Sequence, residues 1–150
     1  MAILDQHLLF SENQAVTADA ISDVIDRGAE APVTANFAPG FAGPLFLVIQ
    51  TGTAFTGLTS LEASLVSDST DDLATSPTVH VSTGAVPVAN LTANKVVAVL
   101  PIPPGEYERY IGIQYDVDGT GTAGTVRAFL TQTPGYWQAM AAVNPVAHNE

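Results

Sequence analysis

The chain has 150 residues, of which 47% are hydrophobic and only 13% are charged. This length suits a single domain with a sizeable core. Fifteen acidic and four basic residues give a formal net charge of −11. That balance argues against a direct nucleic-acid partner, because phosphate binding needs clustered Lys and Arg. The sequence has no cysteine, so neither a disulfide framework nor a thiol nucleophile is expected.

The N-terminal stretch MAILDQHLLF lacks the features of a secretory signal. It has no basic region, and Asp5 precedes any long apolar run. The longest apolar run, residues 45–49, is far shorter than the ~20 residues of a membrane-spanning helix. These features predict a soluble, non-secreted protein without a membrane partner.

Residues 1–20 show no strong strand pattern and are predicted to form an N-terminal arm. Leu8, Leu9 and Phe10 are its main apolar anchors. Two interpretations remain open for them: they cover one end of the domain's own core, or they contact another subunit. The first predicted strand is residues 21–26.

A long loop follows at residues 29–44, where Pro and Gly are frequent. Four further strands are then predicted from apolar runs or period-two alternation, at residues 44–51, 58–67, 78–84 and 95–101. The first and last of these are apolar on both alternating sets, as in strands buried on both faces. In the third, Val79 and Val81 are expected to face inward and His80 to face solvent.

The clearest alternation lies in residues 100–119, after a proline cluster that cannot join a central sheet. One face is expected to carry Tyr107, Ile111, Ile113, Tyr115 and Val117, and the other Glu108, Gln114, Asp116 and Asp118. Two residues break this pattern, since Arg109 falls in the apolar set and Tyr110 in the polar set. Arg109 therefore needs an acidic partner, either Glu106 or an acid on a neighbouring strand, or a route for its charge to water at the rim of the sheet. It either packs its stem on Tyr107 with its head in water, which is the favoured interpretation, or anchors a subunit contact.

The C-terminal part begins with another alternating strand at residues 122–132, with Val126, Ala128 and Leu130 on one face. Residues 134–150 break the pattern and are predicted to form a C-terminal arm with one helical turn at residues 138–143. Tyr136 and Trp137 follow the strand terminator, and such residues are favoured interface anchors. They either fold back onto the domain or dock on another subunit.

Short strands with turn signals and almost no helical periodicity predict an all-β sandwich or barrel of about eight antiparallel strands at residues 21–133. Little in it suggests chemistry. DVDGTG (116–121) opens like a calcium loop, but the twelfth position falls on Arg127, so a hairpin turn is favoured. The histidines, His7, His80 and His148, lack metal-ligand spacing. We expect no catalytic residue, no metal, no cofactor and no enzyme activity, with a metal-dependent β-barrel enzyme as a weak third possibility.

Four segments together resemble the jelly-roll capsid cement (decoration) proteins of short-tailed bacteriophages. They are LLFSENQAVTADAISDVID, PLFLVIQTGTAFT, SLEASLVSDSTDDLATSPTVHVSTG and LPIPPGEYERYIGIQYDV. The PPGEYERYI part is the most specific, and the resemblance covers most of residues 8–131. It implies a jelly-roll β-sandwich with N- and C-terminal arms.

The same resemblance implies a structural virion protein that binds the outer surface of an icosahedral head. Its partners would be the major capsid protein and itself, with a dimer favoured, and it would bridge neighbouring subunits and stabilise the shell against internal DNA pressure. It would be made in the host cytoplasm. The candidate contact residues are Leu8, Leu9, Phe10, Arg109, Tyr110, Tyr136 and Trp137.

The main alternative is a carbohydrate- or receptor-binding β-sandwich, such as a head fibre or lectin-like module, because jelly rolls also serve these functions. It would need exposed aromatic residues near acids and amides. Only Tyr110 with Gln114 and Asp116 hints at such a cluster.

Overall fold

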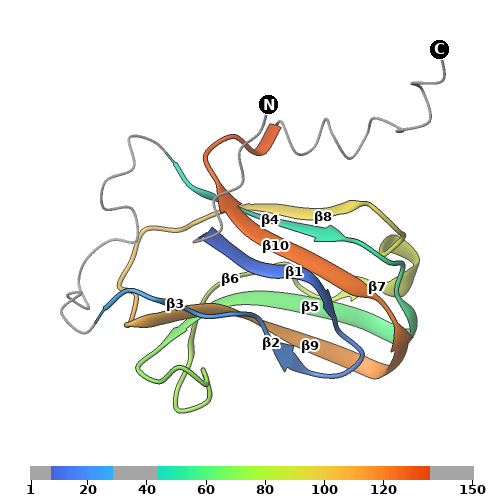
Figure 1. Ribbon diagram of the computed structural model, residues 1–150, viewed down its shortest axis with the longest axis horizontal. Helices are drawn as coiled ribbons and strands as arrows, with labels where there is room; N and C mark the ends of the chain where they lie inside the picture. Colours follow the sequence, from blue (N-terminus) through green and yellow to red (C-terminus); the bar gives the residue numbers. More distant parts are fainter. Residues whose placement is uncertain (1–7, 29–43, 136–150) are drawn as a thin grey trace.

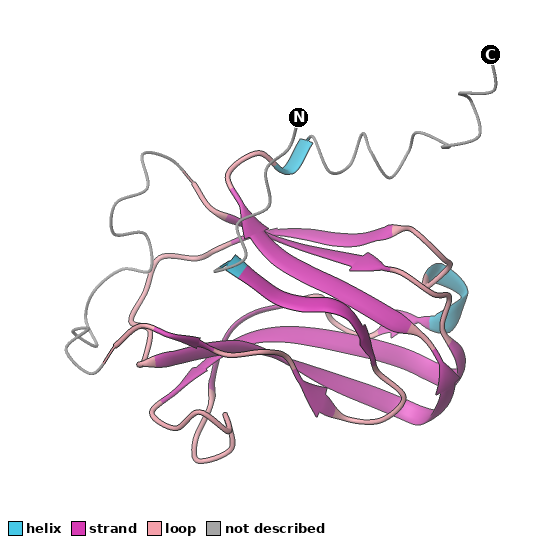
Figure 2. Cartoon of the chain, viewed as in Figure 1, coloured by secondary structure: helices cyan, strands magenta, loops and turns pink. Residues whose placement is uncertain are grey.

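The computed structural model describes residues 8–28 and 44–135. In this part of the chain, ten strands form two antiparallel sheets that face each other as a sandwich (Figures 1 and 2). Helical residues are confined to short turns, such as the 3₁₀ turn Val88–Asn90. The described residues contain no helix long and apolar enough to cross a membrane.

The upper layer in Figure 1 is a four-stranded sheet in which the first and last strands of the chain are neighbours. In spatial order its strands are β1 (Leu9–Ala15), β10 (Thr125–Thr131), β4 (Phe46–Thr51) and β8 (Val96–Pro101).

The lower layer is a six-stranded sheet built on the long antiparallel pair of β9 and β5. Its strands are β2 (Ala20–Ile21), β3 (Ile25–Asp26), β9 (Tyr110–Ala123), β5 (Thr56–Asp68), β6 (Thr78–Ser82) and β7 (Val86–Pro87). Both β2 and β3 pair with β9, and both β6 and β7 pair with β5. The short strands β2 and β3 follow each other along one side of β9, and β6 and β7 do the same along β5. Each of these two sets takes the place of one full strand, so both sheets are four strands wide. This arrangement confirms the predicted jelly-roll β-sandwich.

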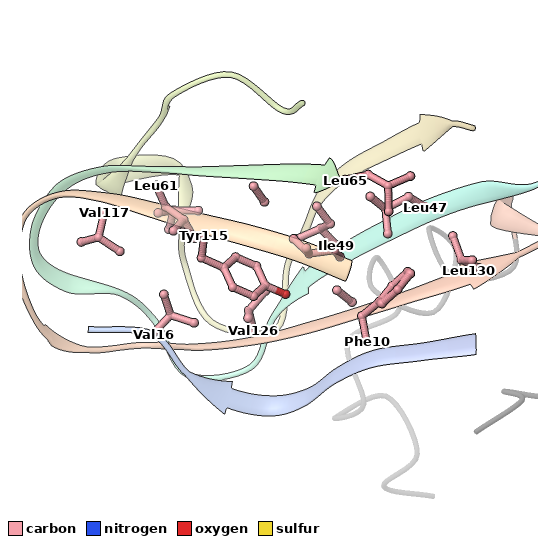
Figure 3. Close-up of a cluster of buried hydrophobic side chains, with 14 of the residues drawn as sticks. Phe10, Val16, Leu47, Ile49, Leu61, Leu65, Tyr115, Val117, Val126 and Leu130 are labelled. Atoms are coloured by element: carbon pink, nitrogen blue, oxygen red, sulfur yellow. The ribbon is translucent and has the colours of Figure 1, made fainter. Parts of the chain in front are cut away.

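The core lies between the two sheets and is built from the inward sets of the alternating strands. Ile111, Ile113 and Tyr115 of β9 are fully buried or nearly so, as predicted, and Val126 and Leu130 of β10 face them from the other sheet. Figure 3 shows the Tyr115 ring pointing into this cluster. Residues with period-two alternation therefore place their apolar side chains in the core as expected.

The N-terminal region differs from the expected arm, because residues 9–15 form edge strand β1. Phe10 has no exposed surface and belongs to the core, which agrees with the first of the two interpretations of the apolar anchors. The pairing of β1 with β10 shifts register twice, and Asn13 adopts a positive φ of 52°. These irregularities break the period-two pattern that would have revealed a strand.

The hairpin turn that the sequence favours for DVDGTG is wrong, since residues 116–121 lie inside β9. The chain passes from β9 to β10, and so from one sheet to the other, at Gly124. Gly124 has φ +141°, and a Cβ built there would clash with the Phe55 ring. Only glycine suits this corner, because other residues rarely adopt that conformation.

The faces of β6 also differ from the prediction. Val81 packs against the core, but Val79 is 57% exposed, and His80 is partly buried rather than solvent-facing. The cause is a register shift, since Leu65 pairs with Val81 while the adjacent Val66 pairs with Val79. This bulge places one extra residue in β6 and turns His80 inward.

Candidate functional site

The N-terminal candidates occupy different environments. Phe10 lies in the core, whereas Leu9 is half-buried on the opposite, outer side of β1, where it pairs with Phe129. Leu8 is half-buried and packs against the edge of the core. Tyr136 and Trp137 lie outside the described residues. Of the N-terminal anchors, Leu9 is therefore the one that faces away from the core.

Arg109 and Tyr110 lie together at one end of the six-stranded sheet, where β9 begins between β3 and β5. The Arg109 guanidinium donates two hydrogen bonds of 2.8 Å to the Asp26 carboxylate on β3 and lies 4.8 Å from the centre of the Tyr110 ring. Of the partners left open for Arg109, an acid on a neighbouring strand is therefore the one that the structure shows. These hydrogen bonds lower the pKa of the Asp26 carboxyl to about 2.

Arg27 strengthens the same junction from the other side. Its guanidinium donates to the backbone carbonyls of Tyr107 and Glu108, and its backbone N–H donates to the Arg109 carbonyl at 2.9 Å. The PPGEYERYI segment is therefore held by side chains of β3 and the residue after it. The Tyr107 hydroxyl closes the segment by donating to the Pro103 carbonyl at 2.7 Å. Two of the four basic residues thus serve this structural junction.

The outer face of the four-stranded sheet carries an apolar row that crosses all four strands. Leu9 pairs with Phe129, Phe129 with Val48, and Val48 with Val99. Paired residues in a sheet point to the same side, so these four side chains lie next to each other. We call Leu9, Phe129, Val48 and Val99 the apolar row.

The centre of the apolar row is buried and its ends are not. Val48 and Phe129 have no exposed surface, whereas Leu9 and Val99 are half-buried, as is Val96 beside them. Among the described residues, those packed against Val48 and Phe129 are Leu9, Val96 and Val99, all of which belong to the same sheet. Leu9 and Val99, with Val96 beside them, therefore present the partly exposed apolar surface of this face, and apolar surface of this kind is typical of contacts with other protein.

The outer face of the six-stranded sheet has the opposite character. Glu62 on β5 and Asp116 on β9 are direct cross-strand neighbours, and Asp118 follows two residues later on the same face. Like charges directly opposite each other destabilise a sheet. The Glu62 carboxylate accepts a hydrogen bond of 2.6 Å from the Ser82 hydroxyl, which compensates part of this cost. The two faces of the sandwich therefore differ sharply in polarity.

An open hollow of about 570 Å³ lies beside this acidic face, where β2 meets β9. Its lining residues are Asp19, Ala20, Ile21, Gln114, Tyr115 and Asp116. The Tyr115 ring is buried in the core, and Tyr110 is not part of the lining. Among the described residues the hollow therefore lacks the aromatic platform that the carbohydrate-binding alternative requires.

One Ser–His pair has the distance of a nucleophile and its base. Ser67 Oγ lies 2.7 Å from Nε2 of His80, whose ring stacks on Tyr107 with 3.8 Å between centroids. Ser67 has no exposed surface, and its Oγ already accepts the Glu108 N–H at 3.1 Å. The pair therefore fits a buried structural hydrogen bond better than a site that a substrate can reach.

The acidic loop after β5 is organised by Asp68. Oδ1 of Asp68 accepts the N–H groups of Ser69 and Thr70, and Oδ2 accepts those of Thr75 and Ser76, at 2.6–3.4 Å. Burial opposes the charge, yet these four bonds lower the pKa of the Asp68 carboxyl below its usual value. Both of its oxygens are thus engaged by the loop itself, and the described residues contain no group of three or more potential metal ligands.

The apolar row was not predicted from the sequence, although a signal for it was present. Residues 44–51 and 95–101 are apolar on both alternating sets, and these segments became β4 and β8, the strands that carry Val48 and Val99. A strand with two apolar faces in a two-layer sandwich must direct one of them away from the core.

Comparison with protein families identifies a match over most of the chain. The model of the family described as Bbp16 matches residues 10–130, which span the sandwich from β1 to β10. No curated protein matches the chain. Because the match covers most of the 150 residues, the chain belongs to the Bbp16 family.

Proposed function

We propose that the protein is a structural virion protein, a cement protein that binds the outer surface of an icosahedral phage head. In this role it bridges neighbouring subunits of the major capsid protein and stabilises the shell against the pressure of packaged DNA. The observation that carries the proposal is the outer face of the four-stranded sheet. The partly exposed Leu9, Val96 and Val99 on this face suit a contact with another protein, which a cement protein needs.

The distribution of charge supports the same role. The formal charge of −11 and the acidic face formed by Glu62, Asp116 and Asp118 suit a protein outside the shell, since a protein facing packaged DNA would more often be basic. An apolar face and an acidic face on opposite sides of one sandwich also orient each copy, with the acidic face toward solvent. The resemblance of the PPGEYERYI segment to cement proteins agrees with this assignment.

Stabilisation follows from many modest contacts. When one cement protein contacts two shell subunits, separating those subunits must break both contacts together. Binding to the closed shell but not to the opened one shifts the equilibrium toward the closed shell. Self-association into a dimer, which we also propose, would double the number of shell subunits joined by one particle.

Co-sedimentation with purified empty heads tests the function. The protein is expected to pellet with the heads to a saturating occupancy and to raise the temperature at which they open. Absence of binding at saturating concentration would refute the proposal. A glycan array run in parallel tests the carbohydrate-binding alternative, for which the hollow beside Gln114 and Asp116 is the natural place.

Truncations then test the terminal segments. Deletion of residues 1–7 or of residues 136–150 is expected to weaken binding to heads while leaving the sandwich folded, because both cuts spare every described strand. The deletion must not extend through Phe10, which is part of the core. If both truncated proteins decorate heads at full occupancy, the terminal segments are not the cement.

A further inference from the structure

Arg127 stands on the outer face of the four-stranded sheet, directly beside the apolar row. Its neighbours Val126 and Ala128 on β10 point into the core, so Arg127 and Phe129 point outward together. Across the sheet, Arg127 pairs with Gln50 of β4, and Gln50 pairs with Val96 of β8. An arginine is thus set at the border of an apolar surface.

This arginine lacks an acceptor for part of its guanidinium. Nε of Arg127 is buried and has no hydrogen-bond partner among the described residues. The ion pair that these residues contain is made by Arg109 and Asp26. Glu12 lies opposite Arg127 across the bulge of β1, but it is exposed and forms no ion pair with it.

A buried guanidinium N–H without an acceptor costs free energy, because it has lost its water without gaining a partner. In a chain with fifteen acidic residues, a partner from the same chain would be easy to supply. The position of Arg127 is therefore better explained by an acceptor that arrives with another molecule. Arginine next to apolar side chains is also common at the interface positions that contribute most to binding affinity.

We propose that Arg127 and the half-buried side chains around it, Leu9, Val96 and Val99, receive a segment of the shell subunit that carries a carboxylate next to an apolar side chain. This inference rests on the proposed function. A carboxylate is the natural acceptor because the planar guanidinium donates two parallel hydrogen bonds to it. The apolar side chain of the partner packs beside the apolar row and excludes water from the ion pair.

A second copy of this chain is a poorer occupant of the same surface. In a twofold interface the same patch lies on both subunits, so this face would meet itself. The central strands β10 and β4 offer Arg127 and Gln50 on this face, so a second copy would have to supply its acid from Glu12 on the edge strand β1. The proposed dimer would therefore use another part of the sandwich, whereas a segment of the shell subunit brings its own acid to this face.

Affinity for purified empty heads, measured by titration with fluorescently labelled full-length protein, tests the inference. Arg127→Gln is expected to weaken binding roughly tenfold or more, which is the cost of leaving a carboxylate without its partner, and Arg127→Glu is expected to weaken it further through repulsion. Arg127→Lys, which keeps the charge but loses the paired hydrogen bonds, should fall between Arg127→Gln and the wild type.

Two control variants separate this role from others. Val79→Glu changes the net charge as much as Arg127→Gln does, but Val79 is exposed on β6 of the other sheet, so its affinity should stay within about twofold of wild type. Glu12→Gln removes the nearest acid across the bulge and should likewise leave affinity unchanged. Unfolding midpoints of all variants establish that each is folded.

The outcomes are distinct. If wild-type protein does not bind heads, the proposed function fails. If wild type binds and Arg127→Glu binds equally well, the inference about Arg127 fails while the function stands. Loss of self-association by Arg127→Glu, measured by light scattering, with unchanged affinity for heads would assign the surface to a second copy and overturn the proposal. Equal effects of Glu12→Gln and Arg127→Gln would assign Arg127 to an internal ion pair, which also overturns it.

Discussion

The hydrogen bond between Ser11 and Tyr115 joins the two sheets through the core and gives a sharp test of the packing. Oγ of Ser11 lies 2.8 Å from the Tyr115 hydroxyl, and both residues are buried. Ser11 also donates to Oε1 of Gln14 at 2.7 Å, and Gln14 is fixed because its Nε2 donates to the Ile21 carbonyl. The single hydroxyl hydrogen of Ser11 is thereby used, so Tyr115 is the donor and Ser11 the acceptor.

This assignment predicts unequal costs for the two single substitutions. Ser11→Ala leaves the buried Tyr115 hydroxyl without an acceptor, which should lower the free energy of unfolding by about 1–3 kcal/mol. Tyr115→Phe leaves Ser11 with its bond to Gln14 intact and should lower it by only about 0.5–1.5 kcal/mol. The double variant should resemble Tyr115→Phe, since neither unpaired group then remains.

Equilibrium unfolding in urea, followed by circular dichroism, measures all four proteins of this double-mutant cycle. Burial raises the pKa of the Tyr115 hydroxyl and that of the Tyr107 hydroxyl, so absorbance at alkaline pH should show two late-ionising tyrosines in the wild type and one in Tyr115→Phe. The reasoning is refuted if Tyr115→Phe costs more than Ser11→Ala, or if the two single effects add in the double variant.

Three further predictions concern the loop, the histidine and the sheet corner. The pKa of the Asp68 carboxyl is lowered in the folded state, so the ionised carboxylate stabilises the fold above pH ~4, and this stabilisation is lost as the pH falls further. The urea midpoint of Asp68→Asn should therefore depend less on pH below ~4 than that of the wild type. Burial lowers the pKa of His80, so the folded state loses stability as the pH falls below ~6.5, and His80→Phe should flatten the midpoints between pH 7 and 5. Gly124→Ala should destabilise the fold by about 1–3 kcal/mol or more, because alanine rarely adopts the positive φ of this position and its Cβ would clash with the Phe55 ring. Gly105→Ala is the control and should be close to neutral, since a Cβ at Gly105 meets nothing within 4 Å. Equal urea midpoints for the two variants would contradict this account.

The regular strands could be read from the sequence because period-two alternation reports directly on burial. The inward set of β9 and the set Val126, Ala128 and Leu130 of β10 were predicted correctly for this reason. Strand β1 was missed because its bulges remove the alternation and because its partner strand lies more than a hundred residues away. The inward turn of His80 has the same cause, since a bulge changes the face of every residue beyond it.

The candidate site was predicted in part. The need of Arg109 for an acid followed from its place in an apolar set, and Asp26 meets it, but pairing alone does not say whether Arg109 also contacts another subunit. A special role of Arg127 could not be predicted, because an arginine at an outward position of an alternating strand is ordinary. Only the three-dimensional arrangement reveals the apolar row beside it and the lack of an acceptor for its Nε among the described residues.

The order of strands in the four-stranded sheet also dictates when the protein can finish folding. Strand β10, the last of the described strands to leave the ribosome, lies between β1 and β4 rather than at an edge. Until it is synthesised, β1 has no partner in this sheet and the edge of β4 stays open (Figure 1). Folding can therefore be completed only once β10 is available, through contacts between distant residues, which makes it slow and exposes unpaired edges to neighbouring chains in the meantime.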